Sequence, residues 1–263
     1  MRLVTSLLFA VLAASPSLSH EFWIEPEVFQ IEAGETLNAN FRNGQEFKGG
    51  ALSWFDRRTR RSEIHLNGNM TEYSGRDGDI PAVSFITSTQ GLISFAHETT
   101  RNRISYEDAA KFDAFVTHKD LDTSAHPNPS YPITEGYVRY AKSLVAIGHG
   151  EGSDQSTGLE IEFVALKNPY SDDLTDGLSF QLLYQNQPRA NAQVEVFERA
   201  PNDEVHIFLL RTDLNGEVTI PVKSGFDYLL DSVLLRSRPE DKINKDGMIW
   251  ESIWASMTFT VPE

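Results

Sequence analysis

The sequence predicts an all-β protein made of two immunoglobulin-like β-sandwich domains, with one short helix inserted in the first. Short runs rich in Val, Ile, Phe, Thr and Tyr recur along the chain, separated by Gly, Asn and Asp turns. One stretch alone changes to helical spacing. Apolar residues make up 40% of the 263 residues and aromatic residues 11%, which is enough to fill packed cores.

The predicted strands are short, as is typical of sandwiches. Asn67-Gly68 and Asn215-Gly216 are predicted hairpin-type turns, because Asn and Gly tolerate positive φ. The strands cover residues 27–31, 37–41, 82–86, 92–97, 158–164, 178–184, 193–198, 206–212, 217–222, 228–235 and 255–261.

The helical stretch covers residues 105–118. Ser105 is its predicted N-cap, with Asp108 three residues later, and apolar residues then follow at helical spacing. The next segment, residues 120–137, is polar and contains Pro127, Pro129 and Pro132. We expect a long loop there.

A domain boundary is predicted within residues 165–177, where Asn168-Pro169 and several Asp residues interrupt the strand pattern. The first domain covers residues 20–166. Residues 167–263 hold about seven strands, which matches the size of one immunoglobulin-like sandwich.

Residues 1–19 read as a cleavable signal peptide. Arg2 supplies a positive charge, residues 3–14 form an apolar run too short to span a bilayer, and Ser17 and Ser19 are small residues before the cut. Cleavage there makes His20 the first mature residue; a cut near Ala14 is the alternative. We expect an exported, periplasmic protein.

The composition excludes several classes of site and partner. The chain has no Cys, which excludes disulfides, Cys-ligated zinc, Fe–S clusters, thiol nucleophiles and a lipidated-Cys membrane anchor. The chain carries 23 Lys and Arg against 38 Asp and Glu, a net charge of −15. That acidity argues against nucleic acid as a partner, because phosphate binding needs a basic surface.

Motifs spread over the mature chain, taken in order, resemble the DUF4198 family. They are HEFWIEP (20–26), FKG (47–49), GRDG (75–78), KFDAF (111–115), DLD (120–122), EGYVRYAKSL (135–144), LEIEF (159–163), NP (168–169), RTD (211–213), NG (215–216) and WESIWASMTF (250–259). The resemblance implies an exported all-β protein concerned with transition metals, since such proteins are often labelled the periplasmic component of cobalt or nickel uptake. A membrane metal transporter is the partner this implies.

His20 is the strongest candidate metal ligand. A terminal His offers its α-amine, with an ordinary pKa of about 7.7–8.0, and its imidazole Nδ1 to one ion as a chelate. One further imidazole would complete a nitrogen site that suits Cu(II) or Ni(II). The alternative is that His20 only starts the first strand.

Three more histidines are candidate ligands, ranked His97, then His126 and His149. His97 shares one strand face with apolar residues, so it is either a ligand at the strand end or a core-edge histidine. His126 precedes Pro127 in the predicted loop, and His149 lies in a Gly-rich segment. Both loop residues are expected to be exposed.

The leading functional hypothesis is a periplasmic protein that binds Ni, Co or Cu for uptake or delivery. No nucleophile–base motif is recognisable, so we expect no enzyme activity. Two alternatives stay open. One is a copper-dependent oxidative enzyme with a terminal-His site, and the other is a metal-free immunoglobulin-like binding or adhesion module.

Overall fold

The computed structural model describes residues 20–263, and the predicted signal peptide lies outside them. The described chain is mostly β, with two short helices, α1 (Ala109–Lys119) and α2 (Glu240–Asp246). No helix among the described residues is long and apolar enough to cross a membrane. The strands are β1 (Glu21–Pro26), β2 (Gln30–Ile31), β3 (Thr36–Gln45), β4 (Lys48–Leu52), β5 (Thr59–Leu66), β6 (Asn69–Glu72), β7 (Val83–Ile86), β8 (Gly91–Thr99), β9 (Asn102–Tyr106), β10 (Ile133–Ile147), β11 (Ile161–Ala165), β12 (Leu178–Tyr184), β13 (Gln187–Pro188), β14 (Gln193–Arg199), β15 (Val205–Arg211), β16 (Glu217–Ile220), β17 (Asp227–Ser237) and β18 (Met248–Thr260).

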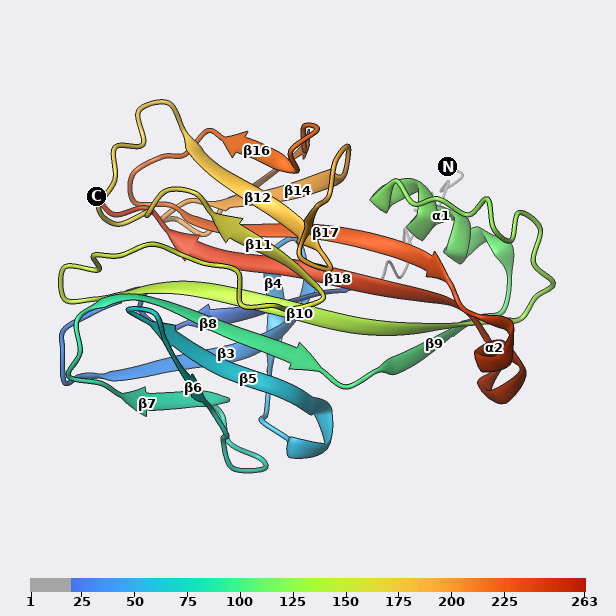
Figure 1. The fold of residues 1–263 in the computed structure, drawn as a ribbon, viewed down its shortest axis with the longest axis horizontal. Helices are drawn as coiled ribbons and strands as arrows, with labels where there is room; N and C mark the ends of the chain where they lie inside the picture. The colour runs from blue at the N-terminus through green and yellow to red at the C-terminus, as the bar shows by residue number, and fades with distance from the viewer. Residues whose placement is uncertain (1–19) are drawn as a thin grey trace, which may run out of the picture.

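One large sheet runs through the whole molecule. Its order is β15-β14-β17-β18-β10-β8-β5-β6, and β2 and β9 also pair with β10. The two longest strands, β10 and β18, lie side by side in its middle and are parallel (Figure 1). They join strands from the two ends of the chain, so the sheet is continuous between its N-terminal and C-terminal halves.

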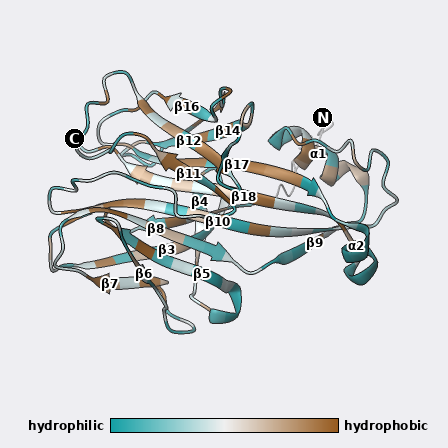
Figure 2. Ribbon diagram, in the orientation of Figure 1, coloured by the Kyte–Doolittle hydropathy of each residue, from teal (hydrophilic) through white to brown (hydrophobic). Residues whose placement is uncertain are grey.

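Two smaller sheets each cover part of the large one. β1, β3, β4 and β7 form the first, and β11, β12, β13 and β16 form the second. Hydrophobic residues concentrate on the strands that face each other, whereas β9 and α2 are hydrophilic (Figure 2). Phe22 and Phe41 of the first small sheet pack with Phe95 of β8, and Phe180 of the second packs with Phe259 of β18. The fold is therefore all-β, as predicted, and its two immunoglobulin-like sandwiches share one sheet.

The division at residues 166–167 stays a prediction. β11 precedes that point, yet it pairs with β12 in the second small sheet. Sequence spacing identifies a linker but not the sheet that a neighbouring strand joins. The second sandwich thus takes a strand from the chain before residue 167.

The inserted helix is confirmed, but its predicted start is wrong. The N-cap of α1 is Asp108, whose Oδ1 accepts a 3.0 Å hydrogen bond from the Ala110 amide. Ser105 belongs to β9, where its Oγ lies 3.0 Å from Thr134 Oγ1 across the pair with β10. A Ser three residues before an acid resembles a cap in sequence, but pairing with β10 holds the backbone extended here. The predicted loop 120–137 ends early, because β10 begins at Ile133.

One of the two Asn-Gly turns is a hairpin. Asn67 and Gly68 have φ of 52° and 75° and join the paired strands β5 and β6. The hairpin prediction at Asn215-Gly216 is wrong, because β15 and β16 lie in different sheets. Asp213 shapes this turn, since its Oδ1 accepts the amides of Asn215 and Glu217, each at 2.8 Å.

Candidate functional site

His20 is the first described residue and is exposed immediately before β1. Its Nδ1 lies 3.2 Å from Asn43 Oδ1, because β1 pairs with β3 in a register that sets Glu21 opposite Gly44. On the other side, the Arg139 guanidinium of β10 donates a hydrogen bond to the His20 carbonyl oxygen. Both small-sheet and large-sheet residues therefore hold His20.

A cavity of about 280 Å³ opens beside His20. Asn43 and Arg139, the two hydrogen-bond partners of His20, line it, so His20 lies next to the lining. Phe22 and Phe41 form part of its wall. The space lies between the first small sheet and the large sheet, at the end where β1 begins.

The cavity is positively charged within an acidic protein. Arg58 and Arg139 line it, and its lining contains no Asp or Glu among residues 20–263. Arg139 is 6% exposed, and no carboxylate of the described chain lies within 4.0 Å of its guanidinium. Its guanidinium carbon instead lies 5.1 Å from the Tyr137 ring centre and 4.9 Å from that of Trp254.

His97 is a buried histidine in the wall of the same cavity. Its ring lies 4.2 Å from the ring of Phe41, and its Nδ1 is 2.5 Å from Ser62 Oγ. Burial lowers the pKa of His97 to about 3, so the imidazole is neutral at physiological pH. Neutral imidazole is the form that binds metals, and Nε2 is the nitrogen that the Ser62 bond leaves unengaged.

His126 and His149 lie elsewhere. His126 is half-buried against the Trp250 ring, 5.0 Å between ring centres, and its Nε2 is 2.9 Å from Ser237 Oγ. His149 is exposed in the turn after β10. Arg139, the partner of His20, precedes the end of β10 by eight residues, or roughly 25 Å of strand.

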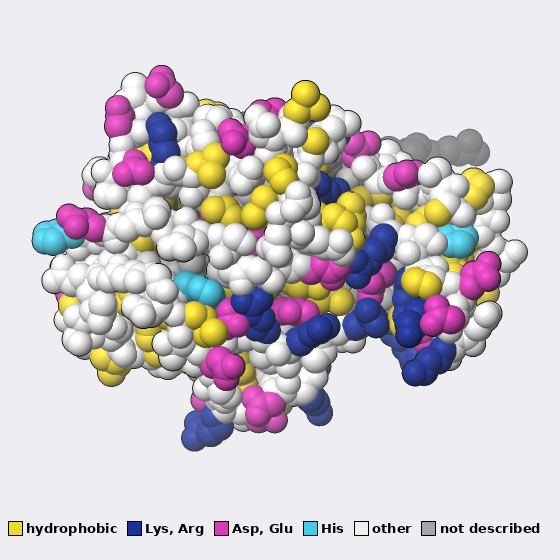
Figure 3. All heavy atoms as spheres, viewed as in Figure 1, with side chains coloured by type: hydrophobic (Ala, Val, Ile, Leu, Met, Phe, Trp, Pro, Cys, Tyr) yellow, Lys and Arg dark blue, Asp and Glu magenta, His cyan; other side chains and the backbone are white. Residues whose placement is uncertain are grey.

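The four sequence-predicted histidines therefore do not converge on one ion. The histidines visible on one face are spread from one end of the molecule to the other (Figure 3). Within the described residues, a single group of three or more His, Asp or Glu side chains has ligand atoms within 4.8 Å of one another, and it contains no histidine. His97 shares the cavity beside His20, whereas His126 and His149 do not line it.

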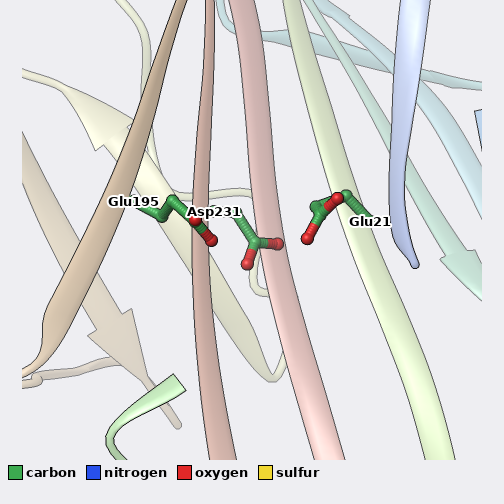
Figure 4. A group of neighbouring side chains, drawn as sticks. All are labelled: Glu21, Glu195 and Asp231. Atoms are coloured by element: carbon green, nitrogen blue, oxygen red, sulfur yellow. The ribbon is translucent and has the colours of Figure 1, made fainter. Parts of the chain in front are cut away.

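That group consists of Glu21, Glu195 and Asp231, from β1, β14 and β17. All three are buried, and their carboxylates point toward one shared space (Figure 4). Burial raises the pKa of both Glu21 and Asp231, because a carboxylate loses its hydration there.

Lys119 occupies the space between these carboxylates. Its Nζ lies 3.0 Å from Glu21, 2.5 Å from Glu195 and 2.9 Å from Asp231. Burial alone would lower the pKa of Lys119, but the three carboxylates raise it above its ordinary value. The ammonium takes the position that a metal ion would need, so this group acts as an ion-pair network that joins α1 to three strands.

The sequence did not reveal this network. Lys119 is 98 residues from Glu21 and 112 from Asp231, so no local spacing connects them. The local pattern gave no signal either, because Glu195 alternates with Val194 and Val196, and such alternation normally places the charged side chain on the solvent face of a strand.

Comparisons with known proteins identify the family. No curated protein matches the sequence. Among solved structures, the D0-D1 domain of intimin is similar at 11% identity and a TM-score of 0.18, over 90% of this chain and 97% of that one. Escherichia coli alpha-2-macroglobulin activated by porcine elastase is similar at 13% identity and a TM-score of 0.24, over 93% of this chain and 20% of that one. TM-scores this low carry no functional argument.

The family model described as "Domain of unknown function (DUF4198)" matches residues 17–234. This range covers most of the chain and includes His20, His97, the helix α1 and the cavity residues described above. The chain is a member of the DUF4198 family.

Proposed function

We propose that this protein is an exported, periplasmic transition-metal-binding protein, and that His20 at its mature N-terminus is the primary ligand for Ni, Co or Cu. The observation that carries the proposal is the position of His20. It is exposed, yet it is held through its carbonyl by Arg139 and through its imidazole by Asn43. The Arg139 contact engages no proposed ligand atom and persists when an ion binds, so the terminus loses less conformational freedom.

The ligand atoms follow from the chemistry of a terminal histidine. After cleavage, the α-amine and Nδ1 of His20 can chelate one ion, which displaces the proton from each nitrogen. The Asn43 amide oxygen lies 3.2 Å from Nδ1, and this contact is released when Nδ1 coordinates the ion. Nitrogen donors of this kind favour Ni(II) and Cu(II) over harder cations. The ion would then pass to a membrane metal transporter.

Lys119 argues against a metal site formed by the three buried carboxylates. The acidic group next to His20 already holds an ammonium at its centre, so a divalent cation there would have to displace Lys119. His126 and His149 lie away from His20, so His97, a second chain or water would complete the coordination sphere rather than those two side chains.

The test is a metal titration of protein that begins at His20. After treatment with a chelating resin, calorimetry with Ni(II), Co(II) and Cu(II) should give one tight site per chain. Binding should be lost in His20→Ala and in a variant with one Gly added before His20, which keeps the imidazole but removes the terminal chelate. His149→Ala, an exposed control, should bind as the unmodified protein does. Unchanged binding by the Gly-extended variant would contradict the proposal.

A further inference from the structure

We propose that the cavity beside His20 binds a small planar organic carboxylate, with Arg139 and Arg58 as the groups that recognise its charge. This inference does not depend on metal binding. It rests on the charge of the cavity lining, on a buried guanidinium without a carboxylate partner, and on the size and aromatic character of the walls.

The charge of the lining opposes that of the protein. A chain with a net charge of −15 would be expected to line an arbitrary cavity with acids more often than with bases. Over the described residues the lining holds Arg58 and Arg139 and no carboxylate. Thr99 and Asn102, at the adjoining ends of β8 and β9, also line the cavity. Local positive potential of this kind concentrates anions.

The buried guanidinium of Arg139 is the main reason to expect a carboxylate ligand. Burying a guanidinium is costly unless hydrogen bonds and an opposite charge compensate. Arg139 donates to the His20 carbonyl and stacks near Tyr137 and Trp254. Its interactions with Glu21, Glu135 and Asp231 are longer-range, since none of these carboxylates lies within 4.0 Å of it in the part of the chain described here. A ligand carboxylate in the cavity would supply the missing contact, with the bidentate geometry that guanidinium favours.

The other lining residues indicate which groups the ligand carries besides its carboxylate. Phe22, Phe41 and Phe55 present aromatic surface, and Thr59 and Asn102 add polar groups that can bind a hydroxyl. A volume of about 280 Å³ lies just below the range for sites of drug-sized ligands, roughly 300–1,000 Å³, and so suits a smaller molecule. A ligand with a single ring and one carboxylate fits both the volume and the lining.

A substitution at Arg58 can test the cavity without disturbing the hydrophobic core. Arg58 is exposed, and its guanidinium carbon lies 5.5 Å from the Phe55 ring centre. Arg57 is the matched control, because it is also exposed and lies 5.0 Å from the same ring, but it does not line the cavity. The two variants Arg58→Gln and Arg57→Gln thus remove the same charge from neighbouring positions.

The experiment is calorimetric titration of benzoate into the mature protein after metal removal on a chelating resin, in buffer free of carboxylate chelators. Benzoate should bind at one site per chain, at least about tenfold more tightly than the neutral analogue benzamide. Arg58→Gln should weaken benzoate binding about tenfold or more, whereas Arg57→Gln should change it less than about twofold.

Four outcomes would overturn the inference. They are no saturable benzoate binding, equal binding of benzamide, inorganic phosphate binding as tight as that of benzoate, and equal effects of Arg57→Gln and Arg58→Gln. Because the protein is metal-free in this experiment, its failure leaves the metal titration of His20 unaffected, and the reverse also holds.

Discussion

The Arg139 guanidinium donates a hydrogen bond to the backbone carbonyl of His20 and so ties the first described residue to the middle of the large sheet. The next residue, Glu21, is fixed by its ion pair with Lys119. Chain termini usually fray unless such contacts hold them. Here two consecutive residues are held by buried basic side chains, which limits the motion of the proposed terminal chelate.

His97 should make the protein sensitive to acid. Burial lowers its pKa to about 3, so the unfolded chain takes up a proton near pH 6.5 while the folded chain does not. The contribution of His97 to the free energy of unfolding is complete above pH 6.5. It decreases by about 1.4 kcal/mol per pH unit as the pH falls toward 3. Between pH 6.5 and 5, the free energy of unfolding of His97→Gln should therefore fall by about 2 kcal/mol less than that of the unmodified protein. Urea denaturation at the two pH values measures this difference. A His149→Gln control should show no such difference, and equal slopes for all three proteins would refute the assignment.

Glu135 should have the opposite effect. It is buried beneath Tyr106 and Ser252, and burial raises its pKa from 4.5 to about 7. Its contribution to stability is therefore complete below pH 4.5 and is lost as the pH rises through 7. As the pH rises from 5 to 8, the free energy of unfolding of Glu135→Gln should increase by roughly 2–3 kcal/mol relative to that of the unmodified protein. Denaturation curves at several pH values test this, with exposed Glu107→Gln as control; a constant difference across that range would count against it.

Lys119 should be essential for stability. Lys119→Met leaves Glu21, Glu195 and Asp231 buried without a cation, which should cost about 3–5 kcal/mol at pH 7. The loss should shrink at pH 5, because the raised pKa values of Glu21 and Asp231 let these carboxyls take up protons. Lys111→Met, an exposed change in the same helix, should be nearly neutral. If Lys119→Met unfolds at the same urea concentration as the unmodified protein, the network is not structural.

Sequence patterns located the short strands better than the long ones. Residues 178–184 were predicted as a strand and form β12 with the same bounds. β18 was predicted only over residues 255–261, although it begins at Met248. It is covered on both faces, so its buried residues include Glu251 and Ser252 and do not alternate simply with polar ones. Such a strand lacks the period-two signal.

The site was predictable only in part. The sequence marked His20 by its position relative to a cleavage motif, and the exposure of His20 agrees with a strand start. It could not indicate that Arg139 would reach His20 or that Lys119 would lie between three carboxylates, because these contacts join residues 76 or more positions apart. They arise from sheet register and helix placement, which local patterns do not encode.

The free α-amine of His20 is the requirement on which the proposed metal site depends most. Mass spectrometry of the N-terminal peptide from the exported protein measures it directly. Our account predicts that the mature chain begins at His20. A mature chain that retains residues before His20, as cleavage near Ala14 would leave, would contradict the terminal chelate.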